Sequence, residues 1–320
     1  MSSGEDLYSC AVSRMTDEYQ VVDVSKWPVA SIEPRGDEPK TWLEEPDSHQ
    51  EPRRWLFKPI TRHEWGDQGE DWSEKISAEV GRLLAVPCAR VELAMHKGER
   101  GLISLDLAPR PLQLFAGMLL MPGVVPGYQV GAARVDGRPG HSLSNIRLAL
   151  AGCAPPPASA LPPTFHAFDV FVGYLLLDAL IANRDRHDEN WAILRPADPV
   201  QPDMLCGAYD HASSLGYNLR DADREQKLRG GRVVHWVKRG TAWRFEHSTP
   251  PGPVTLVALA AEGLRMAGPA TRGYWMDRLH NVDTNLLVNV VSRIPGMSDP
   301  ARTFAMEVLR LNRERLLNEC

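Results

Sequence analysis

Residues 182–190 read Ala182-Asn183-Arg184-Asp185-Arg186-His187-Asp188-Glu189-Asn190, and Ala208-Tyr209-Asp210-His211 follows later in the chain. Asp185 and Asn190 are thus five residues apart, and Asp210 lies twenty residues beyond Asn190. The segments 190–194 and 205–209 are short and largely apolar, which predicts two strands joined by a proline-containing loop. Such a hairpin would bring Asp210 back beside Asn190.

An Asp, an Asn five residues later and a second Asp after a strand pair are typical of a phosphoryl-transfer site. Transfer of a phosphoryl group needs little covalent chemistry from the protein, but it needs positioning and neutralisation of charge. Mg²⁺ prefers oxygen ligands and keeps several waters, so two protein side chains and the phosphate oxygens of ATP are enough to hold it. The spacing therefore predicts a site for Mg²⁺ and ATP.

A lysine for the phosphates of ATP is available in the N-terminal third of the chain. The segment Arg54-Trp55-Leu56-Phe57-Lys58-Pro59 predicts a short strand that Pro59 ends, with Lys58 near its end. A helix is expected at about 71–84, because its apolar residues recur at helical spacing on one stripe. Glu79 falls within this stripe and Glu74 lies nearly opposite, so the periodicity favours Glu79 as the carboxylate that faces inward.

Four segments in this order resemble the HipA-like kinases: Trp-Leu-Phe-Lys-Pro (55–59), Trp-Ser-Glu-Lys (72–75), Asn-Arg-Asp-Arg-His-Asp-Glu-Asn (183–190) and Ala-Tyr-Asp-His (208–211). These are bacterial Ser/Thr kinases with an α-rich C-lobe, related in fold to phosphatidylinositol kinases, and the resemblance covers about residues 30–317. It implies a catalytic loop with Asp185 as the base and His187 as its brace. It also implies Asn190 and Asp210 as metal ligands and Lys58 as the lysine on the phosphates of ATP. The family pattern has a Glu early in the helix, which favours Glu74.

Two features depart from the HipA toxin. The toxin carries an additional small N-terminal subdomain, for which we expect no room before Lys58. Its Gly-rich phosphate loop has its nearest counterpart in residues 31–40, where Gly36 allows one tight backbone approach and Lys40 could supply charge instead. Both departures bear on a toxin function more than on ATP binding.

The segments together predict an α+β chain with a two-lobed protein-kinase-like fold, in which a small mixed N-lobe precedes a larger, mostly α-helical C-lobe. We expect a polar tail at 1–20, the N-lobe at 21–108, and the helical C-lobe with its catalytic loop and metal-binding turn at 109–320. The strand-like segment 101–107 is a candidate hinge, which would place Leu105 and Leu107 beside the nucleotide. An ordinary sheet strand is the alternative for this segment.

Residues 165–182 form the longest apolar run, and they predict a buried helix rather than a membrane span because His166, Asp169 and Asp178 interrupt the run. Its expected part is to hold the catalytic loop that follows. Four scaffold helices are predicted at 253–267, 271–279, 283–293 and 300–317. The last of them has Ser298 at its N-cap and Pro300 in its first turn.

Composition indicates a globular enzyme. The chain has 320 residues, of which 43% are hydrophobic and 24% charged, and its net charge of −5 argues against direct binding of nucleic acid. The five cysteines are scattered without a CxxC motif, which predicts free thiols rather than a zinc site or a disulfide framework. The polar N-terminus shows no signal peptide, so we expect a cytoplasmic protein.

Three motifs have a second interpretation. His187-Asp188 resembles the paired ligands of metal-dependent HD phosphohydrolases, which would need further ligands such as His141 or His166. His141-Ser142 begins a helix, where Ser142 is either a cap or a phosphate acceptor. The segment 224–244 carries seven Lys or Arg residues together with Trp236 and Trp243. It is either a substrate segment suited to an acidic or phosphate-bearing partner or a solvated loop.

The sequence therefore favours a kinase that uses ATP and Mg²⁺ to phosphorylate a hydroxyl, with Ser or Thr of a protein as the expected acceptor. An ATP-binding pseudokinase is the first alternative, and an HD-type phosphohydrolase is the second. The expected partners are ATP, a protein substrate and, from the resemblance, an antitoxin or another regulatory protein. The substrate and the oligomeric state stay open.

Overall fold

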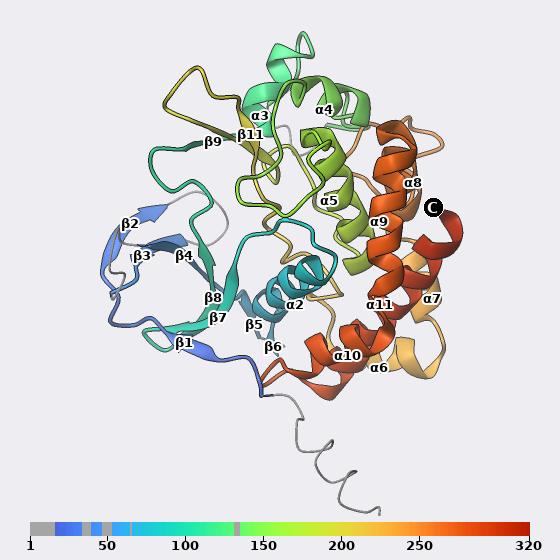
Figure 1. Ribbon diagram of the computed structural model, residues 1–320. Helices are drawn as coiled ribbons and strands as arrows, with labels where there is room; N and C mark the ends of the chain where they lie inside the picture. Colours follow the sequence, from blue (N-terminus) through green and yellow to red (C-terminus); the bar gives the residue numbers. More distant parts are fainter. Residues whose placement is uncertain (1–16, 34–39, 47–52, 65, 131–134) are drawn as a thin grey trace, which may run out of the picture.

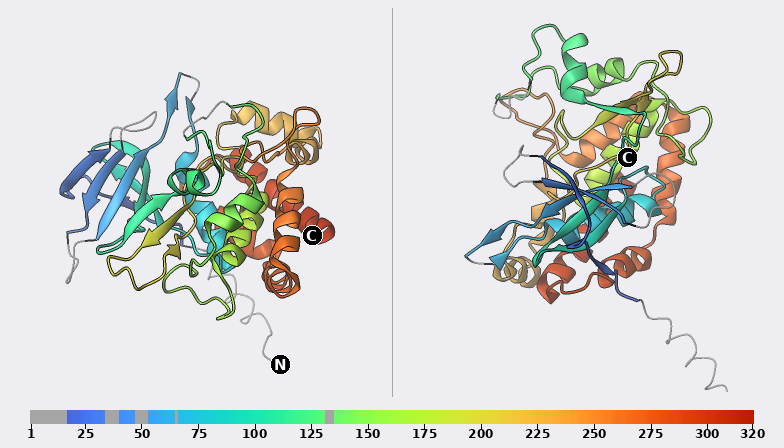
Figure 2. Two further views of the ribbon diagram at one scale, coloured as in Figure 1. Left: turned by 90° about the horizontal axis from the view of Figure 1, so that it is seen from above. Right: turned by 90° about the vertical axis from the view of Figure 1, so that its left-hand side faces the viewer.

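The computed structural model describes residues 17–33, 40–46, 53–64, 66–130 and 135–320. It has two lobes, and Figure 1 shows the sheet of the N-lobe on the left and the helices of the C-lobe on the right, with helix α2 between them. The left view of Figure 2 again separates the blue strands from the orange and red helices. This is the predicted α+β architecture.

The N-lobe is built on a six-stranded sheet in the order β1-β7-β8-β4-β3-β2. Only the pair of β1 and β7 is parallel among these neighbours. The strands are β1 (Val21–Asp23), β2 (Val29–Glu33), β3 (Lys40–Glu44), β4 (Arg54–Pro59), β7 (Val91–His96) and β8 (Glu99–Leu105). A small hairpin of β5 (Arg62–His63) and β6 (Gly66–Asp67) precedes helix α2.

Strand β4 shows why a lysine can leave this sheet toward the other lobe. Trp55 and Phe57 are buried in the core of the N-lobe, and the alternation of a strand turns Leu56 and Lys58 to the opposite face. The pairing of β4 with both β3 and β8 fixes this register, because a slip by one residue would exchange the two faces.

Helix α2 (Glu70–Leu83) packs against the sheet on one side and against C-lobe helices on the other. Its residues Ile76, Val80 and Leu84 join the main core of the C-lobe, as the stripe predicted, and Trp72 joins it as well. Asp71, Glu74 and Lys75 are buried as well, so this helix has a wider buried surface than its apolar stripe alone.

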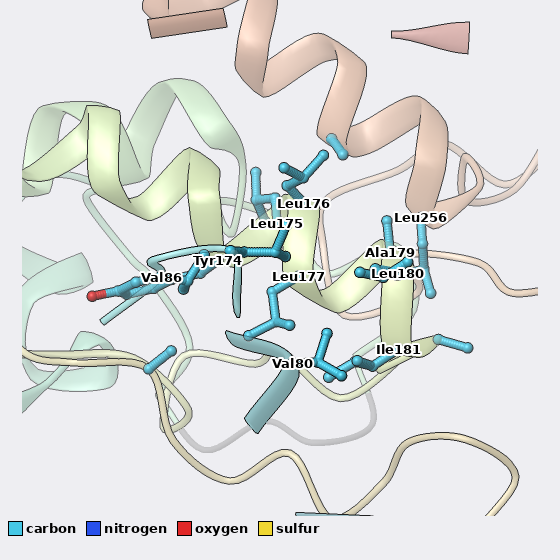
Figure 3. Packing of buried hydrophobic residues seen from close by; sticks show 14 of the residues in the cluster. Val80, Val86, Tyr174, Leu175, Leu176, Leu177, Ala179, Leu180, Ile181 and Leu256 are labelled. Carbon is cyan, nitrogen blue, oxygen red and sulfur yellow. The ribbon is translucent and has the colours of Figure 1, made fainter. Parts of the chain in front are cut away.

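The C-lobe is organised around α5 (Ala167–Ile181), which is buried over almost its whole length. Figure 3 shows its side chains leaving the helix in several directions, with Val80 of α2 and Leu256 of α8 packed against different parts of it. The prediction of a buried helix is confirmed, since α5 is apolar all round and other elements surround it. No helix in the described ranges is long and apolar enough to cross a bilayer.

The remaining C-lobe helices include the four predicted scaffold helices, with ends shifted by up to three residues. The cap at Ser298 is confirmed, since its hydroxyl accepts a hydrogen bond from the backbone N–H of Ala301. The helical elements of the C-lobe besides α5 are α3 (Gly117–Leu120), a 3-10 turn η1 (Met121–Gly123), α4 (Leu143–Ala149), α6 (Asp221–Arg229), α7 (Val233–Lys238), α8 (Leu256–Ala267), α9 (Pro269–Asn281), α10 (Thr284–Ser292) and α11 (Asp299–Glu319).

A second, three-stranded sheet has the order β11-β10-β9. Asn190 lies just before β10 and Asp210 follows β11. Strands β10 (Ala192–Arg195) and β11 (Met204–Leu205) form the predicted antiparallel hairpin, with Ile193 opposite Leu205. Strand β9 (Gln113–Ala116) pairs with the other edge of β10 and was not predicted. The four cysteines in the described ranges are free thiols.

Candidate active site between the lobes

A cavity of about 1130 Å³ lies between the two lobes. Its wall brings together seven of the residues that the sequence singled out. They are Lys40, Lys58, Leu105, Leu107, His187, Asn190 and Asp210. Asp185 and Glu74 are not part of this wall, but Asp185 is paired with Arg244, which lines it, and the charge of Glu74 acts on Lys58.

An ion pair between Lys58 and Asp210 joins the two lobes at the wall of the cavity. The Nζ atom of Lys58, from the N-lobe, donates to Oδ1 of Asp210, from the C-lobe, at 2.9 Å. Burial opposes the charge of Lys58, but Asp210 and Glu74 outweigh burial and raise the pKa of the lysine. Lys58 in turn lowers the pKa of Asp210 far below its usual range. The backbone of Asp210 has φ +60°, a left-handed conformation that is uncommon for residues other than glycine.

Glu74 is the helix carboxylate on the side of this pair. Its Oε1 lies 3.4 Å from Nδ1 of the buried His211. Burial would raise the pKa of Glu74, but the hydrogen bond and charge of His211, together with Lys58, lower it. Glu79 instead pairs with Lys75 and Arg82 at 2.9 and 2.7 Å, away from Lys58. The periodicity argument for Glu79 was wrong because α2 is buried on two sides, so the apolar stripe does not mark the side that faces the cavity.

The predicted phosphate-loop segment is only partly described. Ser31 to Glu33 belong to β2, and Lys40 begins β3 opposite Glu33, so both ends of this segment are paired strand residues. Residues 34–39, including Gly36, lie outside the described residues. Lys40 lines the cavity and contributes to lowering the pKa of Asp210.

Leu105 and Leu107 lie where β8 leads into the C-lobe, at the position expected for a hinge. Both line the cavity, together with Leu56 of β4 and Leu114 of β9. These four side chains give the cavity part of its apolar lining, and Asp106 lies between two of them in the sequence.

The loop 183–190 is held by its own hydrogen bonds. The side-chain nitrogen of Asn190 and the backbone N–H of His187 both donate to the carbonyl oxygen of Asp185 at 2.8 Å. The ring of His187 pairs through Nδ1 with the backbone N–H of Glu189 at 3.2 Å, which is the bracing expected of it. Burial lowers the pKa of His187, so the ring is more readily neutral than a free imidazole.

Arg186 fixes this loop from below. It is fully buried and makes two hydrogen bonds of 2.7 and 2.8 Å to the carboxylate of Asp178 in α5. Its Nη1 donates to the carbonyl oxygens of Asn190 and Tyr209 at 2.5 and 3.3 Å. Arg186 therefore ties the loop of Asp185 and the turn of Asp210 to one helix.

Arg244 is the residue at the site that sequence reasoning missed. Its Nε atom donates a hydrogen bond of 2.7 Å to Oδ1 of Asp185, and its Nη2 atom forms an ion pair with the same oxygen at 2.6 Å. The signal was the basic segment 224–244, whose role as a substrate segment stays a prediction. It forms α6, α7 and a turn, with Arg224 buried against Asp221 and Trp236 packed on Phe304.

The metal-site interpretation of His187-Asp188 finds no support in the geometry. Within the ranges that the structure describes, no group of three or more His, Cys, Asp and Glu residues is arranged to hold a metal ion. His141 uses both ring nitrogens, since Nδ1 pairs with the carbonyl oxygen of Arg244 at 2.7 Å and Nε2 accepts from Nε1 of Trp191 at 3.2 Å. His166 caps the distant start of α5. Ser142 caps α4, as the first interpretation of that motif expected.

Comparison with solved structures defines the class. The chain is similar to the Helicobacter pylori proinflammatory kinase CtkA, with a TM-score of 0.64 and 15% identity over 93% of this chain and 96% of that one. It is also similar to HipA of Shewanella oneidensis MR-1, seen in complex with HipB and operator DNA, with a TM-score of 0.51 and 12% identity over 99% of this chain and 73% of the HipA chain. No family model and no curated protein matches the sequence.

The chain therefore has a two-lobed kinase fold. Within that class its fold is of the HipA-like kind, as the sequence motifs predicted. At identities of 15% and 12%, the likeness establishes the fold, and the chemistry is argued from the site.

Proposed function

We propose that this protein is a kinase that uses ATP and Mg²⁺ to phosphorylate a hydroxyl group, with Ser or Thr of a protein as its acceptor. The observation that carries the proposal is the contact of Lys58 with Asp210 across a cavity that Asn190 also lines. A lysine, an asparagine and an aspartate from three separate segments converge there, as a phosphoryl-transfer site requires. The cavity volume lies slightly above the usual range of small-molecule sites, which suits a nucleotide together with part of its acceptor.

The residues present fit a magnesium ion bound with ATP. Asp210 offers a carboxylate, and Asn190 offers its amide oxygen because its amide nitrogen already donates to Asp185. Mg²⁺ bound there would neutralise charge on the transferring phosphoryl group. Lys58 is placed to bind the α- and β-phosphates once Asp210 turns to the metal, and Glu74 is then the carboxylate nearest to the lysine.

The apolar lining of the cavity supports the adenine part of the proposal. Leu56, Leu105, Leu107 and Leu114 come from both lobes and would supply apolar contacts to a planar base. Asp185 is the base in this proposal, since it lies in the loop beside Asn190 and opposite the expected phosphates. A protein acceptor and a regulatory partner of the antitoxin kind stay predictions from the family resemblance.

The test is incubation of the protein with γ-³²P-ATP and Mg²⁺, wild type beside Asp185→Asn. We expect label on protein with the wild type and a loss of turnover of about 10²-fold or more in the variant, the scale of a lost general base. Binding of Mg·ATP, measured by calorimetry, should change little. Asp277→Asn, on the exposed face of α9, is the control and should keep full turnover.

Two outcomes would overturn the proposal. Binding of Mg·ATP by the wild type without any label or ATP consumption would make the protein an ATP-binding regulatory module. Equal turnover by the wild type and Asp185→Asn would show that the base lies elsewhere.

A further inference from the structure

Arg244 grips one oxygen of Asp185 and leaves the other to the site. The hydrogen bond from Nε and the ion-pair contact of Nη2 both go to Oδ1, at 2.7 and 2.6 Å. The Nε2 atom of His187 lies 3.9 Å from Oδ2, beyond hydrogen-bonding distance. Two nitrogen atoms on one oxygen restrict the rotation of the carboxylate, so Oδ2 has a defined direction.

Arg244 is itself held in place by further contacts within the C-lobe. Its guanidinium lies over the ring of Trp243, 3.9 Å from the centroid. Its carbonyl oxygen pairs with Nδ1 of His141 at 2.7 Å. Because Trp191 donates to Nε2 of that ring, Nδ1 must carry the proton and donate to Arg244. Phe245 stacks on the same ring at 4.9 Å.

The backbone around Arg244 is paired with a second segment. The N–H of Glu246 donates to the carbonyl of His141, and the N–H of His247 donates to the carbonyl of Gly137, both at 2.8 Å. A Cβ atom at Gly137 would lie 2.6 Å from the carbonyl oxygen of His247, so this close approach requires glycine. The position of Arg244 is thus set by the C-lobe alone, before any nucleotide arrives.

Stability alone does not account for this arrangement. The side chains of Arg244 and Asp185 are 16% and 28% exposed, and a partly exposed ion pair contributes little to folding. Arg244 also lines the cavity, so its contact with Asp185 lies at the wall where an acceptor hydroxyl would approach. A group that fixes a catalytic base in a near-attack orientation acts on rate rather than on stability.

We propose that Arg244 is the positioning residue of Asp185: it holds Oδ1 so that Oδ2 faces the acceptor hydroxyl. This inference rests on the proposed kinase function. In the transfer step, the acceptor oxygen forms a bond to the γ-phosphorus as the bond from that phosphorus to the bridging oxygen of ADP breaks. The hydroxyl proton passes to Oδ2 of Asp185, and ADP leaves with the metal.

The experiment compares wild type with Arg244→Ala, Arg244→Lys and Arg239→Ala, with dephosphorylated casein as the acceptor and γ-³²P-ATP as the donor. Arg239 is an exposed arginine at the end of α7 and serves as the matched control. We expect kcat to fall about 100-fold in Arg244→Ala, the lower end of the range for a misplaced base, while KM for ATP stays within about threefold. Arg244→Lys should fall less, because it keeps the charge but cannot make two bonds in a fixed fork.

Chemical rescue separates positioning from a merely structural role. Millimolar guanidinium chloride should restore at least about tenfold of the lost kcat in Arg244→Ala, since a free guanidinium can occupy the same place, and should leave Arg239→Ala unchanged. Circular dichroism spectra and melting curves show whether each variant is folded. If Arg244→Ala does not fold, rescue is sought in Arg244→Lys instead.

Failure of the inference and failure of the proposed function look different. An active wild type with an equally active or faster Arg244→Ala would overturn the inference alone, and a faster variant would identify Arg244 as an inhibitory latch. If kcat falls in Arg244→Ala and Arg244→Lys and guanidinium does not restore it, Arg244 has a structural role and does not position Asp185. An inactive wild type that binds Mg·ATP would overturn both, and this is visible before any variant is compared.

Discussion

The two aspartates of the site are held in different ways. Asp210 is paired with Lys58 across the lobes, over 152 residues of sequence, whereas Asp185 is paired with Arg244 inside the C-lobe. The first pair depends on the position of one lobe relative to the other. The second depends on a set of contacts around His141 that belong to a single lobe.

This difference separates the part of the site that must rearrange from the part that is already built. On binding Mg·ATP, the charges of Lys58 and Asp210 are both needed elsewhere, on phosphates and on the metal, so their pair has to open. The pair of Arg244 and Asp185 can stay intact when Mg·ATP binds, because neither residue is needed as a ligand of the metal or the phosphates. We therefore expect nucleotide binding to act on the Asp210 half of the cavity and acceptor chemistry to act on the Asp185 half.

The largest effect should come from the buried ion pair of Asp178 and Arg186, which supports both the Asp185 loop and the Asp210 turn. Asp178→Ala would leave the buried charge of Arg186 without its partner, and such a loss costs about 3–5 kcal/mol in the free energy of unfolding. Urea unfolding measures this, with Asp203→Ala as the control, since the Arg195–Asp203 pair is partly exposed and should contribute less than about 1 kcal/mol. Equal costs for the two variants would mean that Arg186 does not hold the site.

The second effect is a pH dependence that belongs to the Asp185 half alone. Burial lowers the pKa of His141 to about 4, below its ordinary value of 6.5. The unfolded chain therefore takes up a proton that the folded protein excludes, and stability falls as pH drops from 6.5 toward 4. The total is about 3 kcal/mol, from about 1.4 kcal/mol for each unit of pKa difference.

Urea unfolding at pH 7 and pH 4.5 tests this with wild type, His141→Gln and Asp210→Asn. The advantage of wild type over His141→Gln should shrink by about 2 to 3 kcal/mol at the lower pH. Lys58 keeps the pKa of Asp210 below this window, so wild type and Asp210→Asn should keep the same difference at both pH values. The pKa of His187 is also lowered, and this residue is present in all three proteins. Asp210 acts on this pKa less than burial, Asp185, Arg244 and Glu189 do, so most of the contribution of His187 cancels. A constant difference between wild type and His141→Gln would contradict a neutral His141.

The same division marks what could be predicted from the sequence. The placement of Lys58 and Asp210 could be predicted from the sequence. Residues of β4 alternate between the two faces of the sheet, which sets the direction of Lys58, and the hairpin of β10 and β11 sets the position of Asp210. The local shape of the Asp185 loop could also be predicted, since the hydrogen bonds from Asn190 and His187 to the carbonyl oxygen of Asp185 connect residues at most five positions apart.

Arg244 was out of reach for a physical reason. It contacts Asp185 from 59 residues away, and its place depends on the packing of Phe245 and Trp243, not on any local period. Seven basic residues lie in that segment, and charge alone does not say which one reaches the cavity. Strand β9 was missed in the same way, because its four residues become a strand only by pairing with β10.

The smallest effect concerns nucleotide affinity, and its sign depends on the metal. Asp210→Asn removes a metal ligand, so Mg·ATP should bind about 30-fold more weakly, which corresponds to about 2 kcal/mol. The same change frees Lys58 from its partner and removes a negative charge next to the phosphates. Without metal, ATP should therefore bind a few-fold more tightly to Asp210→Asn than to the wild type.

Calorimetry with Mg²⁺ and with EDTA measures both affinities, and Arg244→Ala serves as the comparison because neither affinity should change in it by more than about threefold. The reversal of sign is what distinguishes a pair that opens on binding from a structural ion pair. A structural pair would weaken ATP binding in both conditions when broken, since Lys58 would lose its fixed position. Weaker binding by Asp210→Asn with and without metal would therefore show that the contact between the lobes is part of the scaffold, and that both aspartates of the site are held in advance of the nucleotide.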